Sequence, residues 1–451
     1  MADRATGRLS PLRRNPGFAL LFWATAGSAV GTYLAALALS VHIFARTGSG
    51  AWLAALLIAD FIPIVVIGIA LGPLVDRLSR RRLMIVSDLV RAATFVALPF
   101  VERPGVIVVL AAVNGIATGF FRPAAWAAFP NLVSEDDREQ ATSLLTTVEH
   151  VAWMLGPVLA GGLLAIQGTD VAYWVNAATF LLSAALVAKI PAASLRSDEP
   201  ITKGHWEDLR AGVGLVFRSR PLLTVLVAWN VSALATGFVN VAEVPLVKDD
   251  LDGGNIGLGF LVGATGFGLV VGSFFAASAL ERFGMRALYA GALLVMAVGF
   301  GVASASPTVA VAAVLAAFAT IGNGAAIVCN QLLVQEGAPD AMRGRALAVL
   351  MSTYYGVLGL AMAGGGLLVD GAGARAAWAV AGLVYLVSTI LALVMTRPSA
   401  NARAARPAEP AGLERIRTLM TEIDETRHRE HENGISDVAL APPERGTRTG
   451  S

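Results

Sequence analysis

The feature that most constrains this chain is a charged turn between two long apolar runs. Residues 72–82 read Gly-Pro-Leu-Val-Asp-Arg-Leu-Ser-Arg-Arg-Arg, and apolar runs at roughly 51–75 and 83–101 border this turn. Each run is long enough to cross the ~30 Å hydrocarbon core of a bilayer as a helix of about 20 residues. The four arginines cannot enter that core, and short arginine-rich turns lie on the cytoplasmic side of membranes. The turn therefore predicts two membrane-spanning helices joined in the cytoplasm.

Composition extends this prediction to the whole chain. Hydrophobic residues make up 56% of the 451 residues and charged residues only 15%, with a mean hydropathy of +0.66. Soluble domains carry about 25% charged residues, so an integral membrane protein in contact with the lipid bilayer is expected. The net charge of +2 does not favour nucleic acid as a partner. Cys329 is the single cysteine, so an intrachain disulfide is excluded.

Twelve apolar runs follow one another along the chain, and a polar connection divides them six and six. The fold class expected is therefore an all-α membrane protein of twelve transmembrane helices in two six-helix bundles. The runs lie at roughly 17–45, 51–75, 83–101, 105–130, 141–166, 171–189, 222–246, 256–280, 287–305, 308–334, 344–369 and 375–396.

The basic residues set the orientation of these runs. Fifteen lysines and arginines lie in the turns on the side of the first charged turn, against four in the opposite turns, so both termini are predicted in the cytoplasm. Five segments follow: an N-terminal arm (1–14), a first bundle (15–190), a cytoplasmic linker (191–221), a second bundle (222–396) and a charged cytoplasmic tail (397–451). In the tail, an apolar stripe of helical spacing predicts a short amphipathic helix with disordered flanks, through Leu413, Ile416, Met420 and Ile423.

The two bundles look like copies of one another. Residues 76–81, Asp-Arg-Leu-Ser-Arg-Arg, align with 281–286, Glu-Arg-Phe-Gly-Met-Arg, at an offset of 205. Residues 161–164, Gly-Gly-Leu-Leu, align with 365–368 at an offset of 204. Parallel repeats of six helices with a cavity between them are typical of transporters that rock one half against the other.

These residues carry a resemblance to a known superfamily. The pattern Gly72-x-x-x-Asp76-Arg77-x-x-Arg80-Arg81-Arg82 is similar to the turn between helices 2 and 3 of the major facilitator superfamily. Other motifs resemble its branch of macrolide-efflux-like, enterobactin-exporter-like and transmembrane secretion effector permeases, the drug:proton antiporter-like branch; they include Asp88-x-x-Arg91, Pro123-Ala124-Ala125-Trp126 and Arg343-Gly344-Arg345. The resemblance implies a secondary transporter that works by alternating access.

Two motifs gain a role from this resemblance. Gly72 allows a close helix approach, and Asp76 is expected to meet the positive N-terminus of helix 11 and so to hold the cytoplasmic side closed. Asp88 and Arg91, one helical turn apart, extend this network of gate residues with Arg77, Arg80 and Arg81. The alternative is that these arginines only set the topology.

The second motif, Gly156-Pro157-x-x-x-Gly161-Gly162, resembles the helix 5 signature of drug:proton exporters, which the family links to export. Proline bends a helix by removing one hydrogen bond, and the glycines permit close packing. The glycine-dense run from Gly263 to Gly272 lies inside an apolar span, so it predicts helix packing and not a nucleotide loop.

Ionisable residues inside apolar runs need a reason, because each costs about 2.5–3.5 kcal/mol or more at the centre of a lipid-facing helix. The candidates for proton coupling or substrate contact are Asp60, Arg122, Glu149, His150 and Glu243. Asp60 and Glu149 are favoured for coupling, because burial disfavours a charged carboxylate and so allows it to take up a proton. Arg122 would oppose that protonation or hold an anionic substrate. A static buried pair or a polar cavity wall is the alternative for both acids.

Some family features are missing. Ser28-Ala29-Val30-Gly31 is followed by Thr32 where the branch commonly has an acid, and the helix 4 arginine that precedes a Gln-Gly pair in proton exporters has no counterpart before Gly119. Proton coupling is therefore expected from the buried acids and the resemblance, with sodium coupling or facilitation as alternatives. Aromatic and amide side chains are candidates for the substrate surface: Trp23, Trp126, Trp153, Trp229, Asn240, Asn330, Tyr354 and Tyr355.

The function predicted is export of a small amphipathic organic molecule, such as a drug, macrolide, siderophore or secondary metabolite, across the plasma or inner membrane by a monomer. An importer of the same fold and a non-transporting membrane sensor or scaffold are the alternatives. No nucleophile, metal-ligand cluster or phosphate loop occurs at workable spacing outside the apolar runs. No enzyme activity, cofactor or metal is therefore predicted.

Overall fold

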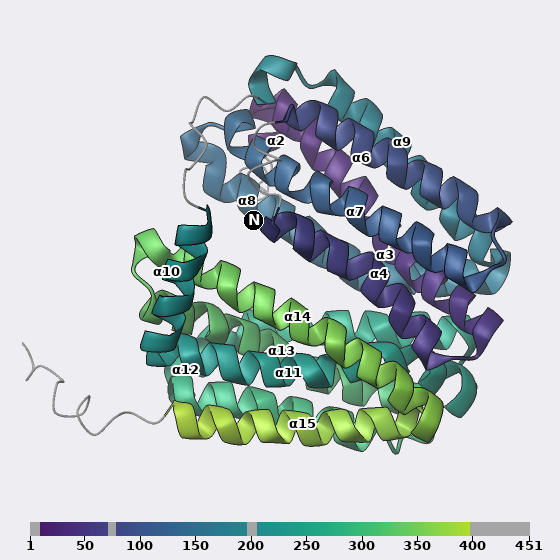
Figure 1. The fold of residues 1–451 in the computed structure, drawn as a ribbon, viewed down its shortest axis with the longest axis vertical. Coiled ribbons are helices and arrows are strands. Elements are labelled where there is room, and N and C mark those ends of the chain that lie inside the picture. Colours follow the sequence, from purple (N-terminus) through teal and green to yellow (C-terminus); the bar gives the residue numbers. More distant parts are fainter. Residues whose placement is uncertain (1–9, 71–77, 196–204, 397–451) are drawn as a thin grey trace, which may run out of the picture. The chain divides into compact units, whose positions relative to one another are not determined.

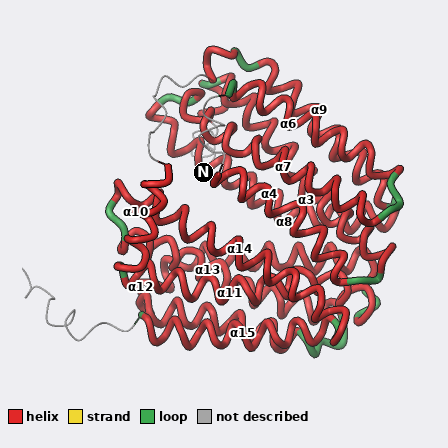
Figure 2. The backbone as a smooth tube through the Cα atoms, in the orientation of Figure 1, coloured by secondary structure: helices red, strands yellow, loops and turns green. Residues whose placement is uncertain are grey.

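A computed structural model of the protein describes residues 10–70, 78–195 and 205–396. In these residues the chain is helical, and Figure 2 shows only helices and short connections. The helices are α2 (Ser10–Arg14), α3 (Pro16–Thr47), α4 (Gly50–Ala70), α6 (Arg80–Ala97), α7 (Pro104–Ala128), α8 (Arg138–Gln167), α9 (Thr169–Lys189), α10 (His205–Arg218), α11 (Arg220–Pro245), α12 (Gly254–Ala303), α13 (Val309–Gly337), α14 (Asp340–Ala372) and α15 (Ala374–Met395). Gly72, Asp76, Arg77 and the predicted tail helix lie outside the described residues.

Eleven of the described helices are long and apolar enough to cross a membrane. The difference from the twelve runs of the sequence lies in α12, which contains both the eighth and the ninth run. At 1.5 Å per residue, its 50 residues would span about 75 Å, more than twice the hydrocarbon core. The helix is interrupted at Gly284, whose φ of 75° and ψ of 162° are not helical. This backbone conformation is open almost only to glycine.

The helices pack into two groups that follow the sequence halves, as Figure 1 shows. In the first half α3 packs on α8 and α9, and α6 packs on α7 and α9. In the second half α11 packs on α14 and α15, and α12 packs on α13 and α15. Lipid gives no hydrophobic drive for such packing, so close contact through small residues takes its place. Gly115 is an example, because a Cβ there would lie 2.1 Å from the Asp60 carbonyl oxygen.

The helix ends lie at two opposite ends of the bundle. At one, here called the Gly50 end, Gly48, Pro245 and Asp370 lie together. At the other, the Arg80 end, α6 begins and α7 and α9 finish, because Arg80 and Arg81 donate to the Ala127 and Ala188 carbonyls.

The two halves contact each other mainly through two helix pairs, α4 with α14 and α8 with α12, and α11 also contacts α3 and α4. The contacts begin at the Gly50 end, where Gly366 packs on Gly50, and reach mid-helix, where Gly359 packs on Ile62. Toward the Arg80 end the ribbons of the two halves diverge in Figure 1, and Trp23 and Trp126 of the first half are 60% and 40% exposed. The halves are therefore in contact at the Gly50 end and apart at the Arg80 end.

The connection between the halves includes one helix, α10. Its Gly212 faces the start of α14, where a Cβ would lie 2.7 Å from the Arg345 carbonyl oxygen, and Val216 is fully buried. The predicted linker is thus packed against the second half over part of its length.

Candidate functional site

The side chains of Arg122 in α7 and Glu149 in α8 form an ion pair on the wall between the halves. The guanidinium Nη2 lies 3.5 Å from the carboxylate Oε1, and the side chains are 51% and 27% exposed. Both side chains are therefore partly exposed, in contrast to those of a fully buried ion pair. It adjoins a small hollow lined by Leu21, Thr25, Phe121, Arg122, Ala125, Trp126, Leu145 and Glu149.

Asp60 in α4 lies apart from this pair and has a different partner. Its Oδ1 accepts a hydrogen bond of 2.7 Å from Nδ2 of Asn114 in α7. Asn114 is only 6% exposed, and the neighbouring Gly115 brings the α7 backbone onto Asp60. The structure thus pairs Arg122 with Glu149, and it places Asp60 in a polar contact inside the first half.

His150 and Glu243 occupy distinct positions. His150 is exposed, and its Nδ1 donates to the Thr146 carbonyl at 2.7 Å, so the ring turns along its own helix and does not join Glu149. Glu243 is half-buried on α11, seven residues from Thr236, a spacing that keeps the two on one helix face. Among the described residues no hydrogen-bond or ion-pair partner of Glu243 is found.

Asp88 and Arg91 form a buried ion pair inside the first half. The Arg91 guanidinium contacts the Asp88 carboxylate one turn away on α6, and the two residues are 3% and 0% exposed respectively. The guanidinium carbon lies 4.4 Å from the ring centre of Phe121 and 4.2 Å from that of Phe180. Stacking of this kind on aromatic faces stabilises a desolvated guanidinium. The pair ties α6 to α7 and α9.

Arg80 and Arg81 bind helix ends of the same half. Arg80 Nη1 donates to the Ala127 carbonyl at 2.7 Å, and Arg81 donates to the Ala188 carbonyl. The last carbonyls of a helix have no partner in the helix and carry partial negative charge, so arginine stabilises them. In the described part of the chain these two gate candidates are thus anchored within the first half.

The helix 5 motif supplies packing surfaces in two directions. A Cβ at Gly156 would lie 2.6 Å from the Tyr33 Cβ in α3, and one at Gly161 would lie 2.8 Å from the Gly259 Cα in α12. The Pro157 carbonyl also faces Gly259. Gly162 has open space beside it, with nothing within 4 Å. Three of the four motif residues therefore determine how closely α8 approaches its neighbours.

The glycine-dense run from Gly263 to Gly272 is a packing surface of α12, as predicted. Gly266 faces Met154 of α8, whereas Gly268 and Gly272 face Ala317 and Ile321 of α13.

Aromatic side chains form a row across the middle of the molecule. The ring centres of Trp229 and Tyr354 are 4.8 Å apart, those of Tyr354 and Tyr355 5.3 Å, and those of Tyr355 and Phe61 5.1 Å. Phe61 belongs to α4 and the other three to α11 and α14, so the row joins the two halves next to Asp60. Such rings offer apolar surface and stacking to an organic molecule.

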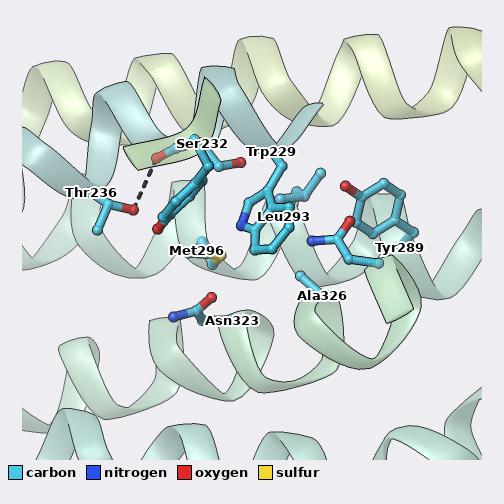
Figure 3. Close-up of a pocket in the computed structure, with 10 residues that line it drawn as sticks. Trp229, Ser232, Thr236, Tyr289, Leu293, Met296, Asn323 and Ala326 are labelled. Atoms are coloured by element: carbon cyan, nitrogen blue, oxygen red, sulfur yellow. Dashed lines mark hydrogen bonds between the residues drawn. The ribbon is translucent and has the colours of Figure 1, made fainter. Parts of the chain in front are cut away.

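A small polar cavity adjoins this row inside the second half. Figure 3 shows Trp229, Ser232 and Thr236 of α11 opposite Asn323 and Ala326 of α13, with the Thr236 hydroxyl donating to the Ser232 carbonyl. Asn330 also lines the cavity, is 4% exposed, and in the described structure its Oδ1 has no hydrogen-bond donor. The volume of about 20 Å³ suits a water molecule, not a whole organic substrate.

Sequence reasoning missed several side chains of this region. Asn114 and Asn323 are amides inside apolar runs, a signal available from the sequence, whereas Phe61 and Tyr289 do not differ in type from packing residues. Only the packing brings Asn323 and Tyr289 to the cavity, Phe61 to the row and Asn114 to Asp60.

The fold defines the class of protein: an all-helical membrane protein whose described helices form two groups that follow the two halves of the sequence. Residues 6–423 match the family described as transmembrane secretion effector. The chain therefore belongs to this family of the major facilitator superfamily, as its motifs predicted.

Sequence relatives and solved structures are in line with this family membership. The chain is 26% identical over 397 residues to the uncharacterized MFS-type transporter YfiS of Bacillus subtilis (strain 168), covering 85% of this chain and 94% of that protein. It is 27% identical over 412 residues to the multidrug efflux pump Tap of Mycolicibacterium fortuitum, covering 88% and 99%. The crystal structure of the nucleoside transporter NupG shares the fold at a TM-score of 0.69 and 13% identity, over 85% of this chain and all of that chain.

Proposed function

We propose that the protein exports a small amphipathic organic molecule across the plasma membrane in exchange for protons. In this proposal α12 crosses the bilayer twice, on either side of Gly284, which gives twelve crossings with both termini in the cytoplasm. The Arg80 end then faces the cytoplasm, and the state described is open to the inside. The similarity to a multidrug efflux pump supports the direction of transport.

The observation that carries the coupling proposal is the half-exposed pair of Arg122 and Glu149. A charge within the membrane is costly unless it is paired, so protonation of Glu149 leaves Arg122 in need of another partner. A polar group of the substrate competes with Glu149 for that place, and the rings of Trp126 and Phe121 bind its apolar part. Proton uptake by Glu149 and substrate binding are thereby linked at one guanidinium, with Asp60 and its partner Asn114 as a second protonation site.

The experiment is a proteoliposome assay with an imposed pH gradient and a panel of fluorescent amphipathic dyes, both cationic and anionic. We expect wild-type protein to move at least one dye against its gradient when the pH gradient is imposed. Glu149→Gln should lose this uphill transport at least tenfold, while dye-for-dye exchange without a pH gradient continues. Exchange continues because the neutral amide resembles the protonated carboxyl group.

Glu139→Gln is the matched control, because Glu139 lies on the same helix as Glu149, is exposed, and precedes Glu149 by ten residues, about 15 Å along α8. It should keep uphill transport. Uphill transport by Glu149→Gln at the wild-type rate would contradict the coupling role. Dye accumulation in the cytoplasm of whole cells, driven by the same gradient, would instead support an importer.

A further inference from the structure

The contact between the halves at the Gly50 end is held by a carboxylate that caps a helix of the opposite half. Asp370, near the end of α14, accepts hydrogen bonds from the Ser49 hydroxyl at 2.9 Å, the Ala51 N–H at 3.1 Å and the Gly50 N–H. The first N–H groups of a helix lack partners within the helix and carry partial positive charge. Asp370 therefore satisfies the start of α4 from across the interface.

A second polar contact joins the halves at the same end. Asn255 at the start of α12 donates through Nδ2 to the Leu164 carbonyl, near the end of α8, at 3.1 Å. The Lys248 ammonium donates to Oδ1 of the same amide. Because Oδ1 faces the lysine, the amide group must direct Nδ2 toward α8. A carbonyl in the last turn of a helix is thus satisfied from the other half.

The sequence repeat relates the two contacts. The offset of 205 that aligns residues 76–81 with 281–286 also carries Gly50 onto Asn255 and Leu164 onto Val369, the neighbour of Asp370. Each contact therefore joins the start of one helix to the end of its partner in the other half. The polarity is reversed: an acid at a helix end binds a helix start in one case, and an amide at a helix start binds a helix end in the other.

These contacts suit repeated opening because they are polar and reached by water. Asp370 is exposed and Ser49 is half-buried, and Asp249 and Asp250 line a cavity beside them. An exposed hydrogen bond exchanged for water costs little net free energy, unlike a buried polar group left without a partner. Beneath them the backbones meet directly, since a Cβ at Gly366 would lie 2.7 Å from the Gly50 carbonyl and 2.8 Å from the Ala54 Cβ.

We propose that Asp370 and Asn255 are positioning residues that hold the outer gate closed, where the outer gate means the contacts of Asp370 with 49–51 and of Asn255 with Leu164. This inference rests on the proposed transport function, in which the Gly50 end faces outward. Losing either contact shifts the protein toward the outward-open state. A smaller inward-open fraction raises the apparent KM for substrate on the cytoplasmic side in proportion.

The test measures opening of the outer gate in the absence of substrate, as the rate at which a buried thiol is labelled. In a Cys329→Ser background, Ala54→Cys places a thiol beneath Asp370, at a position that is 2% exposed. Purified protein in lipid nanodiscs is labelled with a hydrophilic maleimide that reaches both faces. We expect Asp370→Ala to raise the labelling rate at least threefold and Asp370→Asn to give an intermediate rise, because the amide still accepts hydrogen bonds but has no charge.

Two controls isolate the gate. Asp170→Asn removes an acid at the start of α9 that accepts a hydrogen bond from Thr169 of its own helix, and it should leave the labelling rate unchanged. Ala377→Cys places a thiol in a fully buried position inside the second half, and its labelling should not respond to Asp370→Ala. Circular dichroism confirms that each variant is folded, and Asp370→Asn replaces Asp370→Ala if the latter does not fold.

Asn255→Ala tests the second contact and should also raise Ala54→Cys labelling, since both contacts close the same end. Equal labelling in wild type and in folded Asp370 variants would overturn the proposal, as would an equal rise in Asp170→Asn. Because labelling needs neither substrate nor a proton gradient, a failure here is distinct from a failure of the export assay. In the export assay, Asp370→Asn should raise the cytoplasmic-side KM at least threefold.

Discussion

Arg91 shows at the scale of a single residue why a charge can stay inside a membrane bundle. Its guanidinium is paired with Asp88 and enclosed by the rings of Phe121 and Phe180. The Asp88 carboxylate balances the positive charge of the guanidinium, and the two aromatic rings pack against its planar faces. Removal of either charged partner alone leaves the other buried without compensation.

The first prediction concerns this pair. Arg91→Ala should lower the free energy of unfolding by about 3–5 kcal/mol, because it leaves the Asp88 carboxylate buried and unpaired. Arg138→Ala should cost less than about 1 kcal/mol, because Arg138 and Glu135 are 3.9 Å apart and largely exposed. Denaturant titration of the purified protein in detergent measures both. Equal losses would contradict the larger contribution to stability expected of the buried pair in α6.

Asp60 and Glu149 show what the sequence could not settle at this scale. Both were candidates by residue type, yet only the structure assigns Asn114 to one and Arg122 to the other. The spacing of 27 residues between Arg122 and Glu149 carries no helical signal, because they lie on different helices. Their coupling roles stay predictions, as do those of Gly72, Asp76 and Arg77 in the gate.

At the scale of helices, the helix 5 motif acts through the distance between α8 and α12. Gly161 and Gly259 let the two backbones touch, and Gly162 beside them contacts nothing within 4 Å. The position of Gly161 thus requires a residue without a side chain, whereas the position of Gly162 has room for one. The sequence pattern alone does not reveal this difference.

The second prediction separates these two glycines. Gly161→Ala should destabilise the closed interface by about 1–3 kcal/mol, because its Cβ would lie 2.7 Å from the Asn255 carbonyl and the helices must move apart. Gly162→Ala should be neutral or slightly stabilising, since alanine favours helix and has room. Thermal unfolding in detergent, together with maleimide labelling of Ala54→Cys, measures stability and opening. Similar behaviour of the two variants would contradict this view of the motif.

At the scale of the whole molecule, the proposed topology follows from the break in α12. With a break at Gly284, the connection at Arg282 lies at the Arg80 end and the turn near Pro307 at the Gly50 end. An unbroken helix of 50 residues would be more than twice as long as the ~30 Å hydrocarbon core is thick.

The third prediction tests this topology in cells. In a Cys329→Ser background, Gln167→Cys and Pro307→Cys should react with a membrane-impermeant maleimide in intact cells. Ser79→Cys and Arg282→Cys should react only after the membrane is permeabilised. All four positions are exposed, so differences report the side of the membrane. Labelling of Arg282→Cys in intact cells would rule out two crossings by α12.

The sequence by itself determined that the chain is an all-helical membrane protein, where its apolar runs lie and which superfamily it resembles. These features can be predicted because the length of an apolar run and the basic residues of a turn are local properties, and they determine how a segment inserts into the bilayer. Glycine-dense packing in α12 was also predictable, since no other role suits such a run inside a span. The tertiary structure alone decided which helices touch, because a pair such as Ser49 and Asp370, 321 residues apart, leaves no local pattern. It thereby decided the partners of each charge and which end of the bundle is closed.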